Sequence, residues 1–297
     1  MKPTFKAQPV QVQVPATSAN LGPGFDCLGL ALNMNDRYMA QVMDEPGVDI
    51  DVTGEGAESI PTTDKNLVIK AMYKGFDFLG GRPRGISLRQ LNVIPHGRGL
   101  GSSAAAIVGG LALSRALVLG GNERMSNEDM LNIANEMEGH PDNVSAAIYG
   151  GANLAWQESQ RGHVVAQSLN FQVDPRIGVL AFVPSTELST SKARKMLPES
   201  IPHLDAVKNS SNVAVLVQAL QHRIGEHLPV ALGGHVRVIE AVLVREDVVL
   251  SQLGRDVDEV LILQDVTHAD RVDRAVARDS SNWASRMRRA LPRPTYS

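Results

Sequence analysis

The stretch PHGRGLGSSAAAIVGGLAL, from Pro95 to Leu113, joins a glycine-rich turn to an alanine-rich run that is typical of a helix. The small residues of the turn let the backbone come close to a bound group. Backbone amides of residues 99–104 and the start of the helix would then face an anion. Ser102 and Ser103 would offer hydroxyls to a phosphate or to its Mg²⁺. The stretch therefore predicts a phosphate-binding loop.

The same residues allow other interpretations. A Walker A loop is excluded, because no lysine follows the last glycine. The segment GLGSSA does fit the G-x-G-x-x-[GA] pattern of a dinucleotide site, and Glu123 lies about 20 residues downstream, where the ribose acid is expected. The preceding strand alternates polar and apolar residues, whereas the first strand of a dinucleotide-binding fold is buried on both faces. Close helix packing alone would also explain the small residues.

The composition is that of a soluble protein. The chain has 297 residues, is 43% hydrophobic and carries a formal net charge of −3, so it can bury a core and has no overall basic field for nucleic acid or anionic lipid. One cysteine, Cys27, suits a reducing compartment. We find neither a signal peptide nor a membrane span. We expect a cytoplasmic protein that partners neither nucleic acid nor membrane.

Hydrophobic periodicity predicts a mixture of strands and helices without a regular β-α-β count. This pattern favours an α+β fold over a doubly wound sheet. Ser126 and Asp129 resemble a capping box at the start of one helix. The expected strands are 10–14, 40–43, 48–52, 86–95 and 177–184, and the expected helices are 67–80, 102–118, 126–138 and one that begins at 191.

Two further clusters carry polar side chains. In VPATSANLGPGFDCLGLAL (14–32), Asn20 and Asp26 lie on a tight loop and are able either to converge on one ligand or to cap their own backbone. In EGHPDNVSAAIYGG (138–151), Glu138, His140, Asp142 and Asn143 are close in sequence. With a single cysteine and no second histidine at ligand spacing, zinc is a poor fit. A hard cation held between a carboxylate and a phosphate fits better.

These three motifs resemble those of homoserine kinases in the GHMP kinase superfamily. The resemblance covers about residues 10–225 and includes TSKARKMLPESIPHLDAVKNSSNVAVLVQAL (190–220). It implies a two-domain α+β fold with the nucleotide site between an N-terminal domain, 1–165, and a C-terminal domain, 166–297. It also implies transfer of the γ-phosphoryl group of ATP to the side-chain hydroxyl of L-homoserine, a step of threonine biosynthesis, and a homodimer as one assembly.

The resemblance also implies roles for single residues. Asn20, Asp26 and His140 match positions that contact homoserine, as do Thr190 and Arg194, whose guanidinium suits the α-carboxylate. Asp26 either orients the substrate or accepts its hydroxyl proton. Ser103 and Glu138 match ligands of Mg²⁺, and Asn66 falls near the adenine. The triphosphate loop comprises Pro95, His96, Gly97, Arg98, Gly99, Leu100, Gly101, Ser102, Ser103, Ala104 and Ala105.

The resemblance stops near Leu232. The first 232 residues hold eight Lys and eleven Arg, whereas the last 65 hold ten Arg and no Lys, and they lack the family's glycine-rich S-G-[AS]-G-P motif. Ordinary divergence is one explanation, and a shifted reading frame in GC-rich coding DNA is the one we favour. The second predicts a nucleotide-binding chain with little or no kinase activity.

Overall fold

The computed structural model describes residues 2–160, 162–175, 177–184, 194–195, 197–222, 242–244 and 257–263. Its larger sheet has the order β3-β4-β2-β5-β6, and β1 pairs with β2 beside that path. All pairs in this sheet are antiparallel except β3 with β4. The strands are β1 Val10–Ala19, β2 Leu28–Met43, β3 Gly47–Gly54, β4 Gly85–Asn92, β5 Ala152–Gln160 and β6 His163–Phe171.

The strand expected at 40–43 is only the end of β2, which is 16 residues long. β2 pairs with β5 at its start, with β4 at its end and with β1 along much of its length. Conversely, the strand expected at 86–95 ends at Asn92. The next amides, those of Val93 and Ile94, donate to a side chain, the carboxylate of Asp36, rather than to a neighbouring strand.

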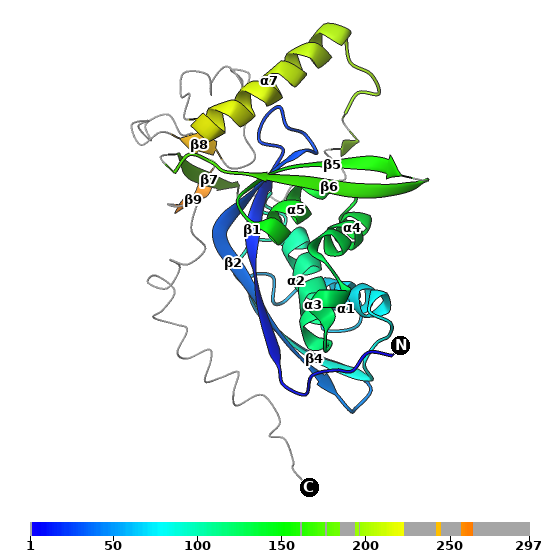
Figure 1. Ribbon diagram of the computed structural model, residues 1–297. Helices are drawn as coiled ribbons and strands as arrows, with labels where there is room; N and C mark the ends of the chain where they lie inside the picture. The colour runs from blue at the N-terminus through cyan, green and yellow to red at the C-terminus, as the bar shows by residue number, and fades with distance from the viewer. Residues whose placement is uncertain are drawn as a thin grey trace. The chain divides into compact units, whose positions relative to one another are not determined.

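Helices lie along this sheet, with α2 and α5 against β1 and β2 (Figure 1). The capping box is confirmed: the Ser126 hydroxyl accepts from the Asp129 amide at 3.0 Å, and the Asp129 carboxylate accepts from the Ser126 amide at 2.8 Å. The helices are α1 Leu67–Phe78, α2 Ser102–Leu117, α3 Gly121–Arg124, α4 Asn127–Glu138, α5 Pro141–Tyr149 and α7 His203–His222.

The hydrophobic core includes buried residues of the larger sheet and of α1, α2 and α4. The Gly/Ala run of α2 serves this core directly. A Cβ added at Gly110 would lie 2.4 Å from the Val68 carbonyl oxygen, and one added at Gly109 would lie 2.4 Å from the ring of Tyr38. The packing explanation for small residues is therefore correct for the body of the helix, which lies beyond the loop itself.

A second sheet has the order β8-β7-β9 and is antiparallel throughout. Its central strand, β7 Gly178–Pro184, confirms the strand expected at 177–184. Its outer strands, β8 Val242–Val244 and β9 Val257–Leu263, come from the part of the chain where the resemblance has ended. Within the described part of the chain, no helix is both long enough and apolar enough to span a membrane.

Candidate active site

The loop between β1 and β2 is held in a conformation that few side chains adopt. Asn20, Leu21 and Asp26 have φ angles of 68°, 43° and 56°, in the left-handed region that costs energy for residues other than glycine. The Asn20 Oδ1 accepts from the Asp26 amide at 2.9 Å. The local-capping interpretation of Asn20 is thus correct, since its side chain binds the backbone of its own loop.

Asp26 meets Arg194, which lies 168 residues further along the chain. The guanidinium donates to both carboxylate oxygens, at 2.8 and 2.5 Å, and its carbon lies 5.4 Å from the centre of the Phe25 ring. Each side chain of the pair keeps about a third of its surface exposed, at 35% and 34%. The bond to Asp26 raises the pKa of Arg194. Two predicted substrate residues are therefore paired at a place that solvent can reach.

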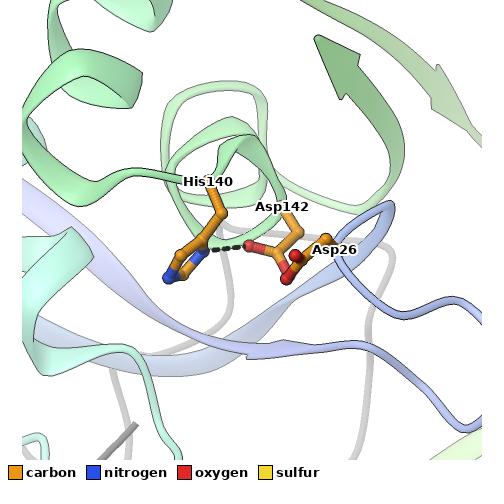
Figure 2. A group of neighbouring side chains, drawn as sticks. All are labelled: Asp26, His140 and Asp142. Atoms are coloured by element: carbon orange, nitrogen blue, oxygen red, sulfur yellow. Dashed lines mark hydrogen bonds and ion pairs between the residues drawn. The ribbon is translucent and has the colours of Figure 1, made fainter. Parts of the chain in front are cut away.

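His140 and Asp142 form a second pair beside Asp26 (Figure 2). The Nδ1 of His140 lies 2.6 Å from Oδ1 of Asp142, which also accepts from the Asn143 amide at 2.8 Å. Asp142 is 1% exposed, and among the described residues its Oδ2 has no hydrogen-bond partner. The pKa of His140 is raised, chiefly by the bond to Asp142 and against the opposing effect of burial. Ligand atoms of Asp26, His140 and Asp142 lie within 4.8 Å of one another.

The predicted phosphate loop has the backbone that its glycines allow. Gly97, Gly99 and Gly101 have φ angles of 68°, 75° and 67°, and α2 begins without any side-chain cap. Its first amides are therefore not used by a capping side chain, which suits an anion at this end of the helix. Leu100, Ala104 and Ala105 are buried, so their side chains support the loop from the core.

Ser103 and Glu138 are brought together from 35 residues apart. The Ser103 hydroxyl donates to the Glu138 carboxylate at 2.7 Å. A hydroxyl and a carboxylate are oxygen ligands of the kind that Mg²⁺ prefers. The pair ends α4 and begins α2, so a cation here would lie beside the amides of the phosphate loop.

Thr17 joins the phosphate loop to the start of α5. Its amide donates to the Leu100 carbonyl at 3.1 Å, and its hydroxyl donates to Oδ1 of Asn143 at 2.7 Å. A Cβ on Gly101 would lie 2.0 Å from the Thr17 hydroxyl oxygen. Only glycine fits there. Sequence reasoning missed Thr17, because nothing in its neighbourhood signals a contact 126 residues away.

Asn66 has a structural role that the sequence did not predict. It is fully buried as the N-cap of α1, where its Oδ1 accepts from the Val68 and Ile69 amides. Its Nδ2 donates to the Pro61 carbonyl at 2.9 Å and to Gln90 at 2.8 Å. Every polar position of this side chain is used, so Asn66 is left out of the site proposed below. Thr190 lies outside the described residues.

Comparison with known proteins gives the site its context. Residues 66–151 match the family described as GHMP kinases N terminal domain. Homoserine kinases of Streptomyces coelicolor and Streptomyces avermitilis are 47% and 45% identical to this chain over 221 residues, covering 74% of it and 70% and 71% of those proteins. The chain belongs to the homoserine kinase family.

The solved structures agree with this assignment. The homoserine kinase of Cytophaga hutchinsonii is 30% identical, with a TM-score of 0.65 over 77% of this chain and 72% of that one. The mevalonate kinase of Methanococcus jannaschii, at 13% identity and a TM-score of 0.54, shares the fold alone. The predicted α+β fold of a GHMP kinase is confirmed.

The dinucleotide interpretation is wrong, for a topological reason. A dinucleotide-binding unit needs a helix that returns to a strand lying parallel and next to the first one. Here the strand before the loop, β4, and the strand after the helices, β5, are separated by β2, which runs antiparallel to both. Glu123 lies within the short helix α3. Its spacing from the glycines along the sequence therefore does not indicate a ribose-binding residue.

Proposed function

We propose that this protein is an ATP-dependent homoserine kinase that converts L-homoserine to O-phospho-L-homoserine, a step in threonine biosynthesis. The observation that carries the proposal is the convergence of its motifs. Thr17 and Asn143 join the phosphate loop to the start of α5, and the side chains of Asp26, His140 and Asp142 gather beside them. The family's name suggests the acceptor, and the cluster of polar side chains supports a binding site for it.

The nucleotide end uses residues 95–105 together with Ser103 and Glu138. Loop amides and the start of α2 would hold the phosphates, and the oxygen pair fits Mg²⁺ as the divalent cation. Such a cation neutralises charge on the transferred phosphoryl group when it is bound. Because phosphoryl transfer has a loose transition state, positioning and charge stabilisation account for most of the catalysis.

The binding site for the acceptor, an amino acid, includes the Asp26–Arg194 ion pair. Homoserine carries an α-ammonium and an α-carboxylate, so it can replace each partner of the ion pair with a group of the same charge. The carboxylate would take the guanidinium fork, and the ammonium would take Asp26. This geometry favours an orienting role for Asp26 over that of a general base. His140 and Asn20 complete the substrate set, with Thr190 as its sequence-predicted member.

The remaining predictions keep their place in the proposal. We place the enzyme in the cytoplasm and allow a homodimer. Residue 165 lies inside β6, which pairs with β5 along its length, so we set the predicted domain boundary after Phe171. The sequence analysis favoured a shifted frame and hence a catalytically impaired nucleotide-binding chain. That alternative rests on the composition after Leu232 and on no observed contact, so we propose the active kinase in its place.

The deciding experiment is ADP release by the purified chain with Mg·ATP and L-homoserine, with mevalonate as the control acceptor. We expect release that depends on homoserine. A chain that binds ATP but never turns over homoserine would support the impaired alternative. In that case reading the coding DNA one base out of frame after codon 232 should recover an S-G-x-G-P segment, and limited proteolysis should remove residues 233–297 first.

A further inference from the structure

A buried carboxylate lies directly beneath the start of the phosphate loop. Asp36 is on β2, is 1% exposed and belongs to none of the motifs that carry the resemblance to homoserine kinases. One of its oxygens accepts from the amides of Val93 and Ile94, at 2.6 and 2.9 Å. These are the last two residues before Pro95, which has no amide hydrogen of its own.

The backbone register explains why Asp36 takes these bonds. The β2–β4 ladder ends at the pair Arg37–Leu91, one residue away from Asp36. Beyond that pair β4 is no longer paired with β2, and the amides of Val93 and Ile94, which follow its last residue, donate to the Asp36 carboxylate. The carboxylate takes the place of the missing strand, and it does so with charge-assisted hydrogen bonds, which are stronger than neutral ones.

The same carboxylate is tied to helix α2 through Tyr38. The Tyr38 hydroxyl donates to the other oxygen of Asp36 at 2.9 Å, and the ring is 1% exposed. That ring lies against Gly109 so closely that a Cβ there would come within 2.4 Å of a ring carbon. Asp36 and Tyr38 therefore touch the chain on both sides of the phosphate loop: Val93 and Ile94, which lead into it, and helix α2, into which it runs.

Burying a carboxylate is expensive, and at Asp36 the hydrogen bonds from Val93, Ile94 and Tyr38 offset that cost. Burial does raise the pKa of Asp36, while its hydrogen bonds and the attraction of His96 lower it. His96 is itself a loop residue. The amides of Val93 and Ile94, which Asp36 holds, lead directly into the segment whose amides face the phosphates in our proposal.

We propose that Asp36 and Tyr38 form a positioning pair for the phosphate loop, which sets the affinity for ATP without contacting it. The pair acts on the loop through the amides of Val93 and Ile94 and on α2 through Gly109. Within the described part of the chain, neither side chain hydrogen-bonds to Asp26, His140 or Arg194, so the influence of the pair falls on the nucleotide and leaves the acceptor end unchanged. This inference rests on the proposed ATP-binding function.

The test is direct measurement of ATP affinity by calorimetry, with the KM for each substrate beside it. Asp36→Asn keeps the shape and loses the charge, and Tyr38→Phe removes only the hydroxyl that touches Asp36. We expect Asp36→Asn to weaken ATP binding about tenfold and Tyr38→Phe about threefold, while the KM for homoserine stays within about twofold of wild type. Tyr38→Phe keeps the test open if Asp36→Asn does not fold.

Asp49→Asn is the matched control. Its carboxylate accepts from Ser87 at 3.1 Å and from Arg89 at 2.7 Å in the same sheet, away from the loop. It should lower the unfolding temperature without changing ATP affinity. The inference is overturned if both variants of the pair, measured where they are fully folded, bind ATP as wild type does. It is also overturned if they raise both KM values equally. A wild-type chain that does not bind ATP would instead refute the proposed function.

Discussion

Replacing Gly101 by alanine should be one of the most damaging single-methyl changes in this protein. The added Cβ would lie 2.0 Å from the Thr17 hydroxyl oxygen and 3.1 Å from Oδ1 of Asn143, at a residue whose φ is +67°. A left-handed backbone costs about 1–2 kcal/mol for a residue other than glycine, and an overpacked methyl costs about 1–3 kcal/mol more. We expect Gly101→Ala to lower the free energy of unfolding by about 2–5 kcal/mol, as measured by urea denaturation.

Gly120→Ala separates the two contributions. Gly120 is also the N-cap of a helix and has a φ of 68°, but its nearest neighbour is the Glu123 side chain at an ordinary 3.6 Å. This variant should show only the backbone cost, about 1–2 kcal/mol. Removing the Thr17 hydroxyl with Thr17→Ala should then recover about 1 kcal/mol of the Gly101→Ala loss in a double-mutant cycle. Equal losses for the two glycine variants, or strict additivity with Thr17→Ala, would refute the argument.

The remaining predictions concern single contacts of the site. Ser103→Ala and Glu138→Ala should each lower turnover, most clearly at limiting Mg²⁺, since each removes an oxygen ligand from the proposed cation; full activity of both there would contradict the assignment. Arg194→Lys should raise the KM for homoserine more than the KM for ATP. The lysine ammonium keeps the charge but loses the paired hydrogen bonds of the guanidinium, which are worth about 1–3 kcal/mol. An equal rise in both KM values would mark Arg194 as structural. Because the pKa of His140 is raised in the folded protein, protonation of His140 stabilises the fold. This contribution to the free energy of unfolding is fully present below pH 6.5 and is lost as the pH rises through the pKa of His140 in the folded protein. An NMR titration should place its midpoint above 6.5, and Asp142→Asn should bring it back toward 6.5; an unchanged midpoint would exclude Asp142 as the cause.

Local signals predicted local structure well. The capping box of Ser126 and Asp129 spans four residues, so its geometry follows from the sequence and was found as expected. The helix α5 was not predicted, although Pro141 at its first position and Asp142 in its first turn are typical of a helix start. Strand β2 was predicted only in part, because its polar residues are held in the strand by pairing with β1, β4 and β5, which the local sequence does not show.

The sequence by itself determined the chemical groups of this protein: a glycine loop before a helix, carboxylates and a histidine near Glu138, and an arginine suited to a carboxylate. Their assembly was decided by the tertiary structure. Asp26 meets Arg194 across 168 residues and Ser103 meets Glu138 across 35, while Asn66 is buried as a cap. The physical reason is that spacing along a chain constrains contacts only within a helical turn or a tight loop. Beyond that range, the register of the sheet and the packing of helices on it decide which polar groups share a site and which become part of the core.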